Sequence, residues 1–203
     1  MNDRRLPIYF LIDASYSMAG AKMSAVNVGR QSIVNKLRTD ALALEMGWIS
    51  IITFGTEAQQ VMKLTSLPEV QIPTIKVPRI KDANWTNLEA GLTKLMDCMD
   101  EEIVPNNIEL EQKGDYKPIV ILFSDGGQTW GEWHNVIERA HARFAKCQNV
   151  TAFVATGGHY RSYFNELKEI VGPTGKAIAL DDFNAETFTK VINIVSQSVS
   201  RAM

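Results

Sequence analysis

The chain has 203 residues, with 21 Lys and Arg against 23 Asp and Glu, so its formal net charge is −2. This balance argues against electrostatic nucleic-acid binding, which needs a basic excess or a basic stripe. Its hydrophobic content of 45% and charged content of 22% are typical of a globular protein and exclude wholesale disorder. The length predicts a single domain over residues 1–203.

The cysteines and the N-terminal segment indicate a compartment. Cys98 and Cys147 form no CxxC pair, which argues against a disulfide framework and fits a reducing environment. The short apolar run 6–12 is cut by Asp13 and lacks the longer hydrophobic region and cleavage site of a signal peptide. No apolar stretch approaches the roughly 18 residues that cross a bilayer. These features predict a cytoplasmic protein.

Strand-length apolar runs alternate with helical segments along the chain. The predicted strands are 7–13, 47–54, 59–64, 118–124, 150–156 and 177–180. The predicted helices are 23–37, a segment that follows Asn87, and segments near 132–145, 160–171 and 185–200. This alternation predicts an α/β fold, a three-layer α/β/α Rossmann-like domain with a mostly parallel sheet. A short turn joins 47–54 to 59–64, which predicts one antiparallel edge strand.

Three further local features make specific predictions. Asn87 is a candidate N-cap for the helix that follows it. Gly29 lies on the apolar face of helix 23–37, where it would allow close approach to the sheet. Pro68, Pro73 and Pro78 exclude a helix over 65–85 and predict an extended path along the surface.

Polar side chains gather where the predicted strands end. Asp13, Ser15 and Ser17 follow the first strand, Asp125 follows strand 118–124, and Thr86 precedes the helix that starts after Asn87. Ligands of open α/β sheets bind outside the carboxyl ends of the strands, so these side chains should converge. Carboxylates and hydroxyls are hard oxygen donors, which predicts a site for Mg²⁺ or Mn²⁺.

The run 13–17 (DASYS), followed by Thr86 and then by Asp125-Gly126, resembles the metal-ion-dependent adhesion site of von Willebrand factor type A domains. The order of elements matches over essentially the whole chain, and the chain looks most like the tellurium-resistance-associated (TerY) type. The resemblance implies that Ser15, Ser17 and Thr86 contact the ion directly. It also implies that Asp13 and Asp125 act largely through water or by hydrogen-bonding the hydroxyl ligands.

The same resemblance implies a docking function without catalysis. A partner protein would supply an Asp or Glu carboxylate to the open position of the ion. The partner is expected in a kinase or phosphatase signalling system or in a bacterial tellurium- or metal-stress complex. Aromatic residues near the predicted ion suggest a partner-binding rim, with packing beneath the loops as the alternative reading. The rim candidates are Tyr16, Trp85, Trp130 and Trp133.

Other functions compete with this interpretation. Asp13 could be the nucleophile of a Mg²⁺-dependent phosphoryl-transfer enzyme, although position 15 holds Ser where a second acid is needed. The chain could also be a scaffold that has lost metal dependence. His134, Glu138 and His141 share a helical face and could hold zinc, although a solvated face is the simpler reading and no fourth ligand is evident.

Overall fold

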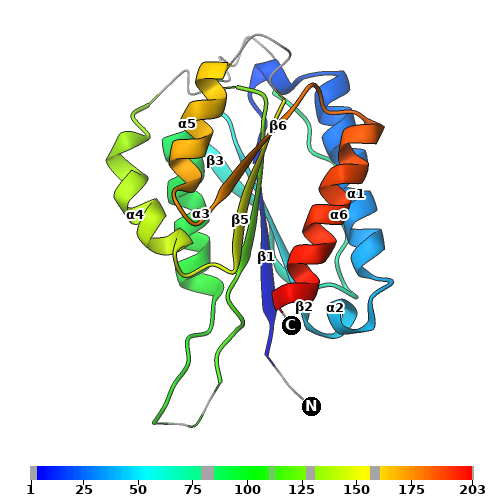
Figure 1. Cartoon of the computed structure of the whole chain (residues 1–203), viewed down its shortest axis with the longest axis vertical. Helices are drawn as coiled ribbons and strands as arrows, with labels where there is room; N and C mark the ends of the chain where they lie inside the picture. Colours follow the sequence, from blue (N-terminus) through cyan, green and yellow to red (C-terminus); the bar gives the residue numbers. More distant parts are fainter. Residues whose placement is uncertain are drawn as a thin grey trace.

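A six-stranded sheet runs through the centre of the molecule, with helices on both of its faces (Figure 1). The computed structural model describes residues 4–78, 85–109, 111, 113–126, 131–155 and 161–202. The strands are β1 (Leu6–Asp13), β2 (Gly47–Phe54), β3 (Ala58–Ser66), β4 (Ile119–Ser124), β5 (Asn149–Ala155) and β6 (Lys176–Leu180). The helices are the short 3₁₀ helix η1 (Tyr16–Met18) and α1 (Ala21–Leu37), α2 (Ala41–Met46), α3 (Leu88–Glu102), α4 (His134–Phe144), α5 (Arg161–Val171) and α6 (Ala185–Ala202).

The sheet has the order β3-β2-β1-β4-β5-β6. All neighbouring strands pair in parallel except β2 and β3, which pair antiparallel at one edge. The predicted mostly parallel sheet with one antiparallel edge strand is therefore confirmed. The inner strands β1 and β4 are buried along their whole length, because helices cover both faces of the sheet.

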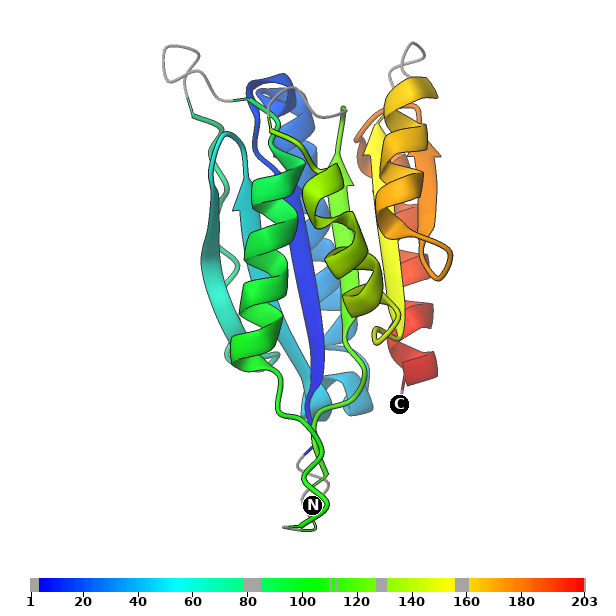
Figure 2. The same cartoon turned by 90° about the vertical axis from the view of Figure 1, so that its left-hand side faces the viewer.

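The helices form two layers around the sheet. Figure 2 shows α3, α4 and α5 across the face nearest the viewer, and α1, α2 and α6 pack on the other face (Figure 1). Successive side chains of β1 point to opposite faces, so Phe10 packs with the α1 and α6 side, and Leu11 with the α3 side. The predicted three-layer architecture is confirmed.

Helix ends follow local capping chemistry. The Asn87 side chain accepts a hydrogen bond from the Ala90 N–H at 3.0 Å, which confirms it as the N-cap of α3. The structure adds α2, which the sequence reasoning did not predict. Asp40 caps α2 by accepting hydrogen bonds from the N–H groups of Leu42 and Ala43, each at 3.0 Å. Six residues are too few to show a helical repeat of apolar positions, so this cap was the available signal.

The segment 67–78 forms no helix, as predicted, and most of its residues lie at the surface, while Leu67, Val70 and Ile75 are buried. Val70 and Ile75 are 4% and 7% exposed and belong to the core on the α1 side. Asn27 of α1 exchanges two hydrogen bonds with the backbone of Ile75, both at 2.9 Å. Arg38 donates to the Val70 carbonyl at 2.6 Å. These contacts fasten the segment to α1, so the path along the surface is held at buried residues that the proline spacing does not predict.

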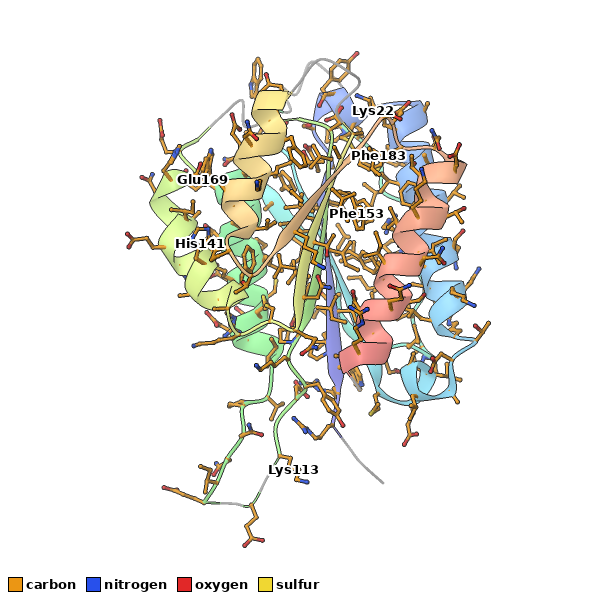
Figure 3. The ribbon with its side chains drawn as sticks, viewed as in Figure 1. Lys22, Lys113, His141, Phe153, Glu169 and Phe183 are labelled. Carbon is orange, nitrogen blue, oxygen red and sulfur yellow. The ribbon has the colours of Figure 1, made fainter. Side chains whose placement is uncertain are left out.

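The connection between α3 and β4 projects from the lower end of the molecule, where Lys113 is labelled in Figure 3. We call residues 103–118 the arm. Its base is held by Arg5, which donates to both carboxylate oxygens of Asp115 at 2.9 and 2.6 Å. The arm therefore lies at the end where β1 begins, opposite the end where the carboxyl termini of β1 and β4 meet. Among the described helices, none combines the length and the apolar character needed to cross a membrane.

Candidate metal centre

The predicted site residues lie at the carboxyl ends of two neighbouring strands. Asp13 is the last residue of β1, and Asp125 directly follows Ser124, the last residue of β4. Because β1 and β4 are adjacent and parallel, both carboxylates reach the same edge of the sheet. This edge is the upper end of the molecule in Figure 1.

Asp13 is fully buried and organises the loop that follows β1. Its Oδ1 accepts a hydrogen bond from the Ser15 N–H at 2.8 Å, and its Oδ2 accepts one from the Ser124 hydroxyl at 2.7 Å. Burial raises the pKa of Asp13 to about 6, with a smaller contribution from the charge of Asp125, against the opposing effect of these hydrogen bonds. An ionised carboxylate at this position is costly unless positive charge lies nearby.

The two serines link Asp13 to Asp125. The hydroxyl oxygens of Ser15 and Ser17 lie 3.1 Å apart, and the Ser17 hydroxyl donates to Asp125 Oδ1 at 2.8 Å. The turn η1 sets this spacing, and Gly20 then adopts a φ of 76°, which lets the chain leave the loop and start α1. The structure thus brings Asp13, Ser15, Ser17 and Asp125 into one hydrogen-bonded group.

Thr86 reaches the same edge through a chain of backbone contacts. It is 4% exposed and lies between Trp85, whose N–H donates to the Thr56 hydroxyl at 3.0 Å, and Asn87, whose N–H donates to the Gly55 carbonyl at 3.0 Å. The neighbouring Phe54 carbonyl accepts the Ala14 N–H at 2.7 Å. The turn after β2 therefore joins the Thr86 loop to the loop that carries Ser15.

Lys22 is a member of the site that the sequence reasoning missed. It lies in the first turn of α1, and its ammonium group contacts Asp125 Oδ2 and the Ser17 carbonyl oxygen, the latter at 3.3 Å. Figure 3 shows Lys22 at the upper end of the molecule. The helix dipole does not favour a cation in this first turn, so Lys22 is held by the carboxylate and the Ser17 carbonyl, and no residue pattern in the sequence signals that contact.

Ser124 was also missed as a site residue. Its hydroxyl donates to Asp13, and the same oxygen accepts the Gly126 N–H at 3.3 Å, so it couples the two loops. A polar residue at the end of an otherwise apolar strand, directly before a candidate ligand, was the available signal.

The predicted aromatic rim is only partly supported by exposure. Tyr16 and Trp85 are 48% and 49% exposed, as a rim requires. Trp133 is 5% exposed and packs with the core on the α3 side, so its assignment to the rim is wrong. The start of the amphipathic helix α4 turns this ring inward, stacked on His134 with centroids 3.8 Å apart. Trp130 lies outside the described residues.

The alternative zinc site gains no support. His141 Nε2 lies 2.7 Å from the Glu169 carbonyl oxygen, and His134 stacks on Trp133. Within the described ranges, no group of three or more His, Cys, Asp or Glu side chains is placed to hold a metal ion. The candidate centre at the sheet edge is of another kind, with two carboxylates and neutral hydroxyls as donors.

The fold and this edge define a class of protein: a doubly wound α/β domain with an oxygen-donor site where the loops after two adjacent strands meet. The model of the von Willebrand factor type A domain matches residues 8–194, so the chain belongs to this family. The family is an adhesion and protein-interaction fold whose members often bind a divalent metal at this kind of site. No curated protein in the comparison matches the chain.

Solved structures share the fold at low identity. The PilB minor pilin from Streptococcus sanguinis has a TM-score of 0.69 and 14% identity, with 98% of this chain and 62% of that chain covered. The pilus adhesin SpaC from Lactobacillus rhamnosus GG has a TM-score of 0.66 and 12% identity, covering 98% and 30%. The ArnB paralog VWA2 from Sulfolobus acidocaldarius has a TM-score of 0.58 and 16% identity, covering 93% and 44%. The chain thus spans less than two thirds of each of these proteins.

Proposed function

We propose that the chain is a metal-dependent protein-interaction module that binds Mg²⁺ or Mn²⁺ at the edge described above. Ser15, Ser17 and Thr86 would contact the ion through their hydroxyls, and Asp13 and Asp125 would act through water or by holding these hydroxyls. An acidic side chain of a partner protein would complete the site. The ion supplies positive charge in a partly dry interface, where a carboxylate gains more from it than in bulk water.

One observation carries this proposal: the hydrogen-bonded group of oxygen donors already attracts a cation. Ser17 and Asp125 are linked at 2.8 Å, and the Lys22 ammonium lies on the second oxygen of the same carboxylate. Hard oxygen donors of this kind suit Mg²⁺ or Mn²⁺ better than a thiolate-preferring metal. The hard oxygen donors suit a divalent ion, and the contact with the Lys22 ammonium indicates that this group of donors attracts positive charge.

The exposed rings of Tyr16 and Trp85 support a protein as the ligand. Both flank the loops of the site, and both are about half exposed although large aromatic side chains are mostly buried. Tyrosine and tryptophan often dominate the binding energy of interfaces. The partner surface would then combine one acidic side chain with apolar area for these rings.

The alternative of a phosphoryl-transfer enzyme fits the geometry poorly. Asp13, its required nucleophile, is fully buried, and both of its carboxylate oxygens accept hydrogen bonds. An attacking carboxylate needs an oxygen that is accessible to the phosphorus atom. We therefore favour docking over catalysis at this edge.

The cellular setting remains a proposal that rests on the family resemblance. A cytoplasmic tellurium-resistance or stress complex linked to a kinase or phosphatase agrees with two free cysteines. The similar pilin and pilus adhesin are proteins of another setting, and at 14% and 12% identity they share the fold alone.

Calorimetric titration of the protein with MgCl₂ and MnCl₂ tests the metal site. We expect binding by the unmodified chain and at least a tenfold loss of affinity, about 1.4 kcal/mol, in Ser17→Ala. Ser32→Ala is the matched control, because its hydroxyl bonds to the Val28 carbonyl within α1 at 3.0 Å, away from the site. If neither ion binds the unmodified chain, the site is a scaffold without metal dependence and the proposal fails.

A further inference from the structure

The contact between Lys22 and Asp125 has a consequence for metal selection. We propose that Lys22 is a built-in counter-cation that occupies Asp125 in the metal-free protein and is displaced when a divalent ion binds. Lys22 thereby sets the metal affinity of the site and excludes monovalent cations. This inference rests on the proposed function, because it concerns the same metal site.

Both carboxylate oxygens of Asp125 have partners within the chain. The Ser17 hydroxyl occupies Oδ1 at 2.8 Å, and the Lys22 ammonium occupies Oδ2. The Asp125 side chain is 2% exposed, so these two partners cover it. An ion that approaches Asp125, directly or through a bound water, therefore competes with the ammonium group.

Lys22 is able to leave. Its side chain is 36% exposed, in contrast to that of Asp125, and the four-carbon stem rotates freely once the ammonium is released. Its position in the first turn of α1 does not hold it, because the helix dipole repels a cation there. Among the ion pairs of the described residues, the carboxylate that pairs with Lys22 is that of Asp125. Its place at the site is therefore owed to the negative charge of that carboxylate and to the Ser17 carbonyl.

The charges explain why the exchange selects divalent ions. The two carboxylates carry −2, and Lys22 contributes +1, so the metal-free group keeps a net charge of −1. A sodium or potassium ion offers the same charge as the ammonium but competes with a tethered group of high effective concentration. A divalent ion interacts twice as strongly with the same carboxylates and brings the group to neutrality when Lys22 leaves.

Chemical labelling of the unmodified protein tests the displacement directly. Brief acetylation followed by mass spectrometry should modify Lys22 slowly in chelator and several-fold faster with saturating Mg²⁺. Lys36, which is exposed in the last turn of the same helix, is the internal reference and should react equally in both conditions. Equal labelling of Lys22 with and without Mg²⁺, in a protein that binds Mg²⁺ by calorimetry, would overturn the inference and leave the proposed function intact.

Variants test the effect on affinity and selectivity. Lys22→Met keeps an unbranched side chain of similar length and removes its charge, so it should bind Mg²⁺ about tenfold more tightly. NaCl should weaken Mg²⁺ binding more in Lys22→Met than in the unmodified chain. Lys36→Met removes one charge from the same helix and should leave the affinity unchanged. Unchanged or weaker binding by Lys22→Met overturns the inference, and absence of Mg²⁺ binding in every variant overturns it together with the proposed function.

Discussion

Asp13 is a buried carboxylate whose ionisation costs free energy in the metal-free protein. Its pKa of about 6 lies roughly two units above that of an unfolded aspartate, and the main cause is burial. The neutral form is therefore favoured by folding. The stabilisation from this group is complete below the unfolded pKa near 4 and is lost as the pH rises through 6. At neutral pH, a bound cation would compensate this cost.

The variant Asp13→Asn, unfolded in the presence of chelator, tests the cost of this ionisation. The amide is nearly isosteric and has no charge, so the variant should escape the cost of ionisation. Between pH 4 and pH 7, its free energy of unfolding should rise relative to that of the unmodified chain by about 2 kcal/mol. Urea unfolding followed by circular dichroism at several pH values measures this difference.

The matched control for this experiment is the addition of Mg²⁺. Positive charge at the site favours the ionised carboxylate, so Mg²⁺ should stabilise the unmodified chain at pH 7 and do so less in Asp13→Asn. A difference between the two proteins that stays constant over the pH range would show that Asp13 does not titrate as its burial requires.

The sequence predicts the donors of the site but not all of their partners. The ends of parallel strands meet at one edge, so the spacing of Asp13 and the two serines sufficed to predict that they converge on Asp125. The contact of Lys22 depends on where a long side chain turns after α1 begins, and no pattern of residue types encodes that rotamer. Trp133 is a residue that the sequence wrongly predicts at the site. It lies near Asp125 in the sequence, but its ring is buried at the start of α4.

Helices α1 and α6 pack closely against each other at Gly29. Gly29 of α1 faces the ring of Phe188 of α6, and a Cβ at position 29 would lie 1.9 Å from the nearest ring atom. Phe188 in turn packs on Phe123 of β4, with ring centroids 5.7 Å apart. The sequence predicts a close approach at Gly29, but to the sheet, whereas the contact is with the neighbouring helix.

Substitution of Gly29 by alanine tests this contact. Gly29→Ala should lower the free energy of unfolding by about 2–3 kcal/mol, because the new methyl group forces Phe188 out of its place in the core. Chemical unfolding measures the loss. The double variant Gly29→Ala with Phe188→Leu should recover part of it, since the smaller side chain makes room. If the two substitutions are simply additive, position 29 and Phe188 do not pack against each other as the structure places them.

Helices with a long repeat of apolar residues could be predicted from the sequence. Segments whose burial depends on side chains far away in the sequence could not. The stripe of apolar residues after Asn87 is enough to define α3 and its cap. The burial of Val70 and Ile75 depends on side chains of Asn27 and Arg38, more than thirty residues earlier, so proline spacing alone indicates an extended path but not its depth. Helix α2 was missed because its cue is a single cap.

At the scale of the whole molecule, the candidate centre and the arm lie at opposite ends of the sheet (Figures 1 and 3). They are separated by the length of β1, whose eight residues span about 26 Å. The net charge of −2 does not reveal this arrangement, because both carboxylates of the site are concentrated at one end. A metal ion would therefore act locally, by joining loops that come from three separate parts of the chain.

Hydrogen exchange with and without Mg²⁺ tests whether the ion acts locally. Saturating Mg²⁺ should slow amide exchange several-fold in the segments 14–20 and 85–88, because the ion restrains the local opening of these loops. Exchange in the arm residues 104–109 should stay unchanged, since their opening is local to the other end of the molecule. Ser17→Ala should lose the slowing at both segments. Equal slowing in the arm, or none near Ser15 and Thr86, would mean that the ion does not join these loops at the sheet edge.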